Sequence, residues 1–273
     1  MASTPLPLTT SPPASGSNAV SITEALVRRD RLVVLGGLFT VVALAWRYLL
    51  AGAGLDMSGP VNMRMIWTPS YALLMFLMWW IMMIAMMLPS ATPMILFFAT
   101  ANRKWRSQGA PYVPTGVFAA GYLLAWAGFS LAATALQWWL ESLGWLSSME
   151  MRSTSIALGG GLLIAAGLYQ LTPLKHACLR HCRSPLEFVI TRWRGGHRGA
   201  LRMGAEHGLY CLGCCWVLMG LLFYGGIMNL YWIIGLAALV LLEKSTPPGH
   251  GLGYLSGVGL ILWGASLLTA VSR

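Results

Sequence analysis

The amino-acid sequence predicts an all-α membrane protein, a polytopic transmembrane helical bundle of about seven spans. Of its 273 residues, 57% are hydrophobic and 10% are charged, and the mean hydropathy is +0.66. A soluble domain carries about 25% charged residues. Several apolar runs also reach about 20 residues, the length that a helix needs to cross a bilayer. We therefore expect the lipid bilayer to surround most of the chain.

Charged or helix-breaking residues separate the apolar runs. The first run follows three arginines, the second ends at the basic residues 103–106, and the third ends before Glu141. The fourth is rich in glycine, which suits close helix packing in membranes. A Gly-Gly pair separates the fifth from the sixth, and a Pro-Pro-Gly sequence separates the sixth from the seventh. The expected spans cover residues 32–51, 71–101, 113–139, 155–171, 207–224, 229–242 and 251–270.

Six spans is the main alternative, if the fifth and sixth form one kinked unit or the first is peripheral. Between the fourth and fifth spans we expect a short helix that begins at Pro173, because Thr172 can cap it and proline is favoured in a first helical turn. A basic loop over residues 183–202 follows. This segment connects the two parts of the chain that hold the cysteines.

The amino-terminal residues and the basic residues predict the domain organisation and orientation. Residues 1–20 are rich in Pro, Ser and Thr, so we expect a disordered cytoplasmic tail over residues 1–27 and one helical membrane domain over residues 28–273. The amino terminus and the connections after the second, fourth and sixth spans hold fourteen of the 18 Lys and Arg residues. Cytoplasmic loops are enriched in these residues, which places the amino terminus in the cytoplasm. The same distribution argues against nucleic acid as the reason for the net charge of +10.

All five cysteines and four of the five histidines lie within residues 168–218. In the fifth expected span, His207, Cys211, Cys214 and Cys215 follow at i, i+4, i+7 and i+8, which places them on one helix face. Thiolate and imidazole ligands suit zinc, or copper(I) where the site is soft. The alternative is that these cysteines are small buried apolar residues.

The short helix after Pro173 carries a second group of candidate ligands. Cys178 and Cys182 stand at i and i+4 with His181 beside them, so the pair can chelate one ion. His176 falls on the far side of a regular helix. The alternative is a polar turn at the membrane surface, with His181 facing the headgroups. If the two helices pack together, they complete a site of four or more soft ligands.

The second expected span is rich in methionine. Six methionines share one half of the helix, and because thioethers bind copper(I), this face is a candidate secondary path for the metal. Methionine is also an ordinary filler of apolar gaps, which is the alternative. Pro89 and Pro93 are expected to break or kink this span. The six are Met75, Met78, Met82, Met83, Met86 and Met87, with Met78, Met82 and Met86 as the secondary candidate ligands.

Two further patterns leave alternatives open. Glu243-Lys244 at the end of the sixth span is either an ion pair among the headgroups or a functional pair that serves as a proton relay or ligand. Cys211 and Cys214 form a C-x-x-C, the spacing of dithiol exchange sites. We find no phosphate-binding glycine loop, nucleophile elbow or zinc-protease motif, so no nucleotide site is expected and an enzyme is not the favoured interpretation.

Three motifs together resemble the DUF2182 family, a bacterial family of predicted metal-binding integral membrane proteins. They are M-W-W-I-M-M-I-A-M-M-L-P-S-A-T-P, G-L-Y-Q-L-T-P-L-K-H-A-C-L-R-H-C-R-S-P and C-L-G-C-C-W-V-L-M. The resemblance covers about residues 70–244 and implies a helical protein of the bacterial inner (plasma) membrane with a metal-related function. By motif match its candidate ligands are Cys178, Cys182, Cys211, Cys214 and Cys215.

We therefore expect an inner-membrane protein that binds copper, with zinc as the alternative, for transport, handling or delivery to a partner. A membrane oxidase or a small metal-binding protein would be such a partner. Two other hypotheses stay open: a membrane oxidoreductase, either metal-dependent or based on thiol-disulfide exchange, and a structural subunit of a membrane complex. The expected ligands are Cys178, Cys182, Cys211, Cys214 and Cys215, assisted by His181 and His207.

Overall fold

The computed structural model describes residues 16–54, 67–106, 113–147, 151–246 and 251–271, with the backbone alone for residues 16–30, 54 and 271. Within these ranges the regular structure is helical, apart from one isolated β-bridge between Leu146 and Ser153. The predicted all-α class is therefore confirmed. The predicted tail of residues 1–27 falls partly on residues 1–15, which lie outside this description, and partly on the first turns of a helix that begins at Gly16.

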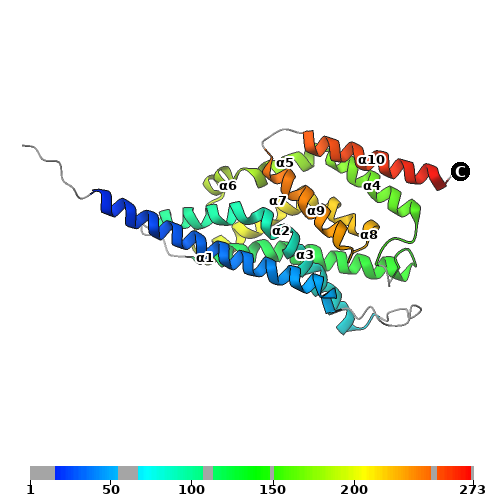
Figure 1. The fold of residues 1–273 in the computed structure, drawn as a ribbon, viewed down its shortest axis with the longest axis horizontal. Coiled ribbons are helices and arrows are strands. Elements are labelled where there is room, and N and C mark those ends of the chain that lie inside the picture. Colours follow the sequence, from blue (N-terminus) through cyan, green and yellow to red (C-terminus); the bar gives the residue numbers. More distant parts are fainter. Residues whose placement is uncertain (1–15, 55–66, 107–112, 148–150, 247–250, 272–273) are drawn as a thin grey trace, which may run out of the picture.

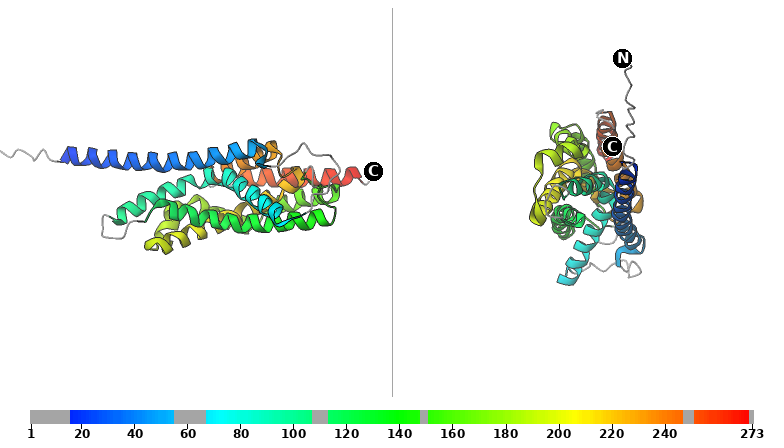
Figure 2. Two further views of the ribbon diagram at one scale, coloured as in Figure 1. Left: turned by 90° about the horizontal axis from the view of Figure 1, so that it is seen from below. Right: turned by 90° about the vertical axis from the view of Figure 1, so that its left-hand side faces the viewer.

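The helices run back and forth along one long axis, with the carboxyl-terminal end of α10 and the carboxyl-terminal end of α3 at the same end of the bundle (Figure 1). Figure 2 shows α1 lying along the outside of the bundle, with its amino-terminal turns projecting beyond the other helices. The elements are α1 (Gly16–Leu50), η1 (Gly52–Gly54), α2 (Pro69–Arg106), α3 (Thr115–Ser142), α4 (Ile156–Gln170), α5 (Pro173–Arg183), α6 (Pro185–Arg192), α7 (Gly196–Gly220), α8 (Leu222–Gly225), α9 (Leu230–Ser245) and α10 (Gly251–Val271).

Fewer helices than expected have the length and apolarity to cross a membrane. Within the described ranges these are five, and α4 with α5 makes a sixth if this pair, bent by 63°, counts as one span. Helix α9 has only 16 residues, which is short for the hydrocarbon core of a bilayer. The expected count of seven was therefore too high by this measure, because α4 and α9 are each shorter than a full span. The five are 31–50, 69–106, 115–142, 196–225 and 251–270.

The predicted basic loop of residues 183–202 is wrong in part, because α6 occupies its first half and α7 begins at Gly196. The reason is a local cluster of ion pairs around Glu206 on α7. The Glu206 carboxylate lies 3.1 Å from Arg194 Nη1 and 3.2 Å from Arg202 Nε. One acid thus reduces the repulsion that would otherwise disfavour packing these arginines together.

Helix α2 runs as one helix through Pro89 and Pro93, so the proline residues bend it rather than break it (Figure 1). Side-chain donors add to the backbone hydrogen bonds between the two prolines. The hydroxyls of Ser90 and Tyr122 donate to the Met87 carbonyl oxygen at 2.8 and 3.1 Å. The second of these bonds ties α3 to α2 at this point.

Glycines set the two closest helix pairs, α3 with α7 and α4 with α10. A Cβ atom on Gly204 of α7 would lie 2.0 Å from the Phe118 carbonyl oxygen of α3. In the second pair, a Cβ on Gly167 of α4 would lie 2.5 Å from the Gly257 carbonyl oxygen of α10. The close packing predicted for the glycine-rich fourth span is therefore confirmed. A similar glycine contact holds α7 against α3, and α7 is the helix that carries three of the cysteines.

Candidate metal site

Helix α7 presents three cysteines to the interior of the bundle. Cys211, Cys214 and Cys215 are at most 2% exposed, and all five cysteines of the chain are free thiols. The Cys214 and Cys215 thiols donate to the Cys211 carbonyl oxygen at 3.0 and 2.9 Å. The spacing therefore places the three thiols within the core, as the shared helix face predicted.

Helix α5 packs against this face and adds a fourth thiol. The Cys182 thiol lies beside those of Cys211 and Cys214. The neighbouring Cys178 lies against Gly213, where a Cβ atom would be 2.8 Å from its Sγ. The Tyr169 hydroxyl donates to the Gly213 carbonyl oxygen and holds the end of α4 at the same place. We call the thiols of Cys182, Cys211, Cys214 and Cys215 the thiol cluster.

Polar groups from three other helices surround Cys211. The ammonium nitrogen of Lys244 on α9 lies 2.9 Å from Cys211 Sγ and 2.9 Å from the Ser90 hydroxyl on α2. The Tyr122 hydroxyl of α3 lies 3.1 Å from the same sulfur atom. Cys211 is thus the point where α2, α3, α7 and α9 meet, and a positive charge stands beside its sulfur.

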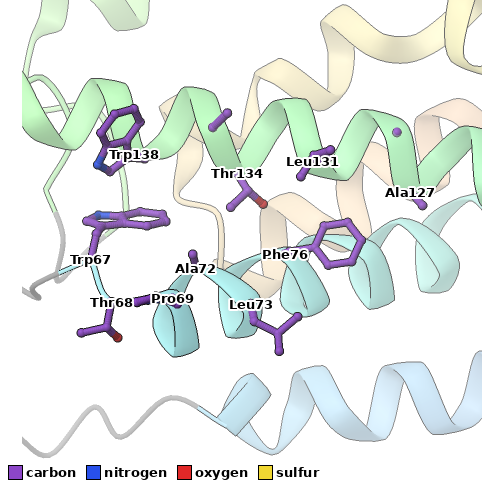
Figure 3. A pocket seen from close by; sticks show the side chains of 12 residues that line it. Trp67, Thr68, Pro69, Ala72, Leu73, Phe76, Ala127, Leu131, Thr134 and Trp138 are labelled. Carbon is purple, nitrogen blue, oxygen red and sulfur yellow. The ribbon is translucent and has the colours of Figure 1, made fainter.

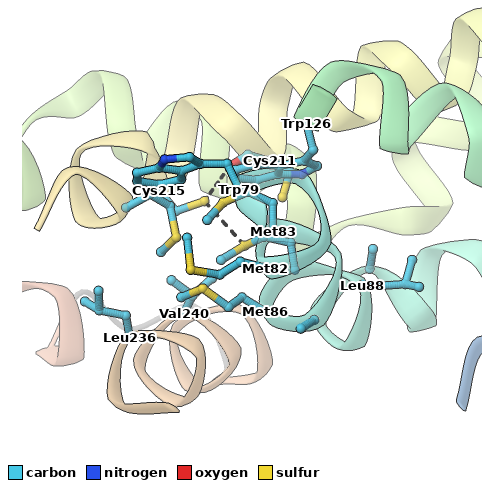
Figure 4. Close-up of a cluster of buried hydrophobic side chains, with 14 of the residues drawn as sticks. Trp79, Met82, Met83, Met86, Leu88, Trp126, Cys211, Cys215, Leu236 and Val240 are labelled. Carbon is cyan, nitrogen blue, oxygen red and sulfur yellow. Dashed lines mark hydrogen bonds between the residues drawn. The ribbon is translucent and has the colours of Figure 1, made fainter. Parts of the chain in front are cut away.

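Methionine thioethers of α2 lie next to the thiol cluster. The Cys215 thiol lies 3.9 Å from Met87 Sδ. Figure 4 shows the side chains of Met82, Met83 and Met86 between the helix of Cys211 and Cys215 and the helix of Leu236 and Val240. The predicted secondary ligands Met78, Met82 and Met86 are all buried in this region.

The three candidate histidines lie in different surroundings. His207 lies one turn before Cys211 and is 3% exposed, and no described residue forms a hydrogen bond with its Nδ1. The rings of Phe118, Tyr122 and Phe188 surround it. His181 instead stacks on Tyr210 at 4.4 Å, and His176 stacks on Tyr254 of α10 at 5.9 Å. Of the predicted histidine ligands, only His207 lies beside the thiols in the core.

The donor types fit a soft metal, whereas their present arrangement does not enclose one. In the part of the chain that the structure describes, no group of three or more His, Cys, Asp or Glu side chains could hold a metal ion. One reason is that Cys214 and Cys215 turn their thiols back to the Cys211 carbonyl oxygen. Copper(I) accepts low coordination numbers and prefers thiolate and thioether sulfur. A pair of thiols that left these hydrogen bonds, with Met87 close by, would supply such ligands.

A comparison with protein-family models connects this site with a metal. The model of the PpoB2 family, described as a copper chaperone, matches residues 76–267, which is more than half of the chain and includes the whole thiol cluster. The chain belongs to this copper-chaperone family. The preference for copper over zinc is thereby supported. No curated protein and no solved structure matches the chain.

A second buried network lies next to the thiol cluster in this member of the copper-chaperone family. Lys175 Nζ of α5 lies 2.6 Å from Glu243 Oε2 of α9, and the two side chains are 1% and 3% exposed. Gln170 Nε2 donates to the other carboxylate oxygen at 2.7 Å, and the Arg183 guanidinium donates to the Glu243 carbonyl oxygen. This network fixes α5 on α9 and so positions Cys178 and Cys182.

Glu243 and Lys244 are neighbours in the sequence, but their side chains bind different partners. Successive residues on a helix point about 100° apart, so Glu243 faces Lys175 and Lys244 faces Cys211. Interpreting the pair as an ion pair among the headgroups was therefore wrong. Tyr122 and Ser90 were missed, because single hydroxyl residues in apolar helices give no sequence signal for a sulfur partner.

A large apolar pocket lies elsewhere and does not serve the thiol cluster. Its volume is about 790 Å³, and it lies between the start of α2 and the second half of α3 (Figure 3). Its lining includes Trp67, Phe76, Leu131 and Trp138 and contains no charged side chain. Such a surface is suited to lipid chains and offers no soft ligand to copper.

Proposed function

We propose that this protein is a copper chaperone of the bacterial inner membrane that binds copper(I) at the thiol cluster and passes it to a partner protein. The observation that carries this proposal is the packing of α5 against α7, which places the Cys182 thiol beside those of Cys211 and Cys214. Two separate sequence motifs thereby contribute thiols to one place. Membership in the copper-chaperone family supports copper as the metal.

The exposure of the thiols favours exchange with the partner through α5. Cys178 and Cys182 are partly exposed, whereas the three thiols of α7 are buried. A partner that takes copper by ligand exchange must reach a thiol, so it meets α5 first. Helices α5 and α6 lie at the end of the bundle that also holds the basic end of α2 (Figure 1). Because basic ends face the cytoplasm, this exchange takes place on the cytoplasmic side, where we also place the amino terminus.

Copper binding is the first property to measure. A Cys182→Ser, Cys211→Ser, Cys214→Ser variant is expected to lose the copper that wild-type protein retains through purification, about one ion per chain, because thiolates are the strongest soft ligands present. Elemental analysis of protein from cells supplied with copper and zinc measures the metal content. A Met203→Leu variant, which removes a buried sulfur atom elsewhere in α7, should keep its copper.

Three results would contradict the proposal. Wild-type protein without copper under these conditions would exclude stable binding, and zinc in its place would identify the alternative metal. Copper that remains in the triple variant would exclude the thiol cluster. Reversible oxidation of Cys211 and Cys214 in metal-free wild-type protein would instead favour thiol-disulfide exchange, for which the C-x-x-C spacing is suited.

A further inference from the structure

The methionines of this chain are concentrated in one membrane helix. Seven of the 16 methionines lie in α2, and the helices α1, α3, α4, α9 and α10 contain none. These other helices fill their apolar contacts with Leu, Ile, Val, Ala and aromatic residues. Apolar packing is thus achieved without methionine in these five helices, so packing alone does not explain why α2 contains seven.

Six of these methionines form a continuous buried face. Met75, Met78, Met82, Met83, Met86 and Met87 are each at most 2% exposed. Residues three and four apart on a helix lie about 5–6 Å from each other, so each thioether has another within about one turn. With a rise of 1.5 Å per residue, the face is about 18 Å long. We call these six residues the methionine face.

The two ends of the methionine face meet different polar groups. At one end, the Gln137 side-chain amide donates to Met75 Sδ at 3.6 Å and to the Glu141 carboxylate at 2.9 Å. The other carboxylate oxygen of Glu141 accepts a hydrogen bond from the Trp67 indole at 2.9 Å. At the other end, Met87 Sδ lies 3.9 Å from the Cys215 thiol. A carboxylate that attracts cations is thus joined to the thiol cluster by a row of thioethers.

We propose that the methionine face is a relay that carries copper(I) between the Glu141 end of the bundle and the thiol cluster. This inference rests on the proposed copper function and adds its route. At each step, a copper–sulfur bond to the next thioether forms as the bond to the previous one breaks, and the metal remains copper(I). At the last step the bond to Met87 breaks as a bond to the Cys215 or Cys211 sulfur atom forms, and that thiol releases its proton. Thioethers are weaker ligands than thiolates, so the ion ends at the thiol cluster.

The test uses a variant in which leucine replaces the middle of the relay: Met78→Leu, Met82→Leu, Met83→Leu and Met86→Leu. Leucine and methionine have similar volumes, and such exchanges cost less than about 1.5 kcal/mol each. The control variant, Met94→Leu with Met203→Leu, removes two buried methionines outside the methionine face. The full chain is reconstituted in vesicles sorted by a carboxyl-terminal tag so that the tag faces outward. Helix α10, which precedes the tag, ends on the same side of the bundle as α3, which carries Glu141 (Figure 1).

Copper(I) is added outside, and loading of the thiol cluster is followed by the ultraviolet absorption of copper-thiolate bonds. We expect the relay variant to load at least tenfold more slowly than wild-type protein and the control variant, with the same final copper content. Equal loading rates in all three proteins would overturn the relay and leave the thiol site intact. Failure of the wild-type protein to bind copper would instead overturn the proposed function itself.

A second measurement detects the ion on the relay directly. In a variant with all five cysteines replaced by serine, silver(I), which resembles copper(I) and does not change oxidation state, is added to protein labelled at the methionine methyl groups. The methyl resonances of the methionine face should shift, and that of Met203 should not. Shifts that affect all methionines alike, or none of them, would contradict the proposal even if the variant loads slowly.

Discussion

A Glu243→Leu variant is expected to lose about 3 to 5 kcal/mol of folding free energy, because it leaves the Lys175 ammonium buried without its partner. The two groups are 2.6 Å apart, and neither side chain is more than 3% exposed. Gln170 also loses its carboxylate acceptor. The free energy of unfolding can be measured in mixed micelles of a mild detergent and dodecyl sulfate, with tryptophan fluorescence as the signal.

Two further variants show whether the buried charge is the cause. Lys175→Met combined with Glu243→Leu removes both partners and is expected to recover most of the lost stability, since apolar pairs replace buried ion pairs with little loss. Glu206→Gln removes an acid from the more exposed cluster with Arg194 and Arg202, and its effect should stay near 1 kcal/mol or less. A double variant as unstable as the single one would contradict this explanation.

The second large effect is expected at the contact between α3 and α7. In Gly204→Ala the new methyl group would lie 2.0 Å from the Phe118 carbonyl oxygen, and the backbone of α3 can relieve this overlap only by moving away. Overpacking of this kind costs about 1–3 kcal/mol or more. Because Tyr122 and Cys211 meet across the same interface, the separation of the two helices should also weaken copper retention.

Gly220→Ala on the same helix is the matched control. A Cβ at Gly220 has no atom within 4 Å, and alanine is favoured over glycine inside helices by about 1 kcal/mol. Its stability should therefore equal or exceed that of the wild-type protein. If Gly204→Ala and Gly220→Ala unfold at the same denaturant concentration, the close approach of α3 and α7 is not what stabilises this interface.

The helical class and the candidate ligands that share one helix could be predicted from the sequence. The contacts between different helices could be predicted only in part. Periodicity alone placed Cys211, Cys214 and Cys215 on one face, because all three belong to one regular helix. The approach of Cys182 could be stated only as a condition, since it depends on the bend of 63° between α4 and α5. Periodicity contains no information about such an angle.

The residues around the ligands were harder to predict for the same reason. His181 was expected among the ligands, but its ring stacks on Tyr210 of α7. The two residues are more than two dozen positions apart in the sequence. Lys244 was visible as a charge at a helix end, and its partner Cys211 lies on a different helix. Local sequence fixes the direction in which a side chain leaves its helix, and only the packing of helices decides what it meets.

The contact between Lys244 and Cys211 would also determine the net charge of the proposed copper-bound site. A copper(I) ion held by two thiolates forms a complex with one negative charge. Such a charge is unfavourable in the interior of a membrane protein unless a cation stands beside it. The Lys244 ammonium, 2.9 Å from Cys211 Sγ, would supply that cation and make the copper-bound site electrically neutral. Because a dithiolate zinc(II) complex carries no negative charge, the same lysine would favour the monovalent over the divalent metal.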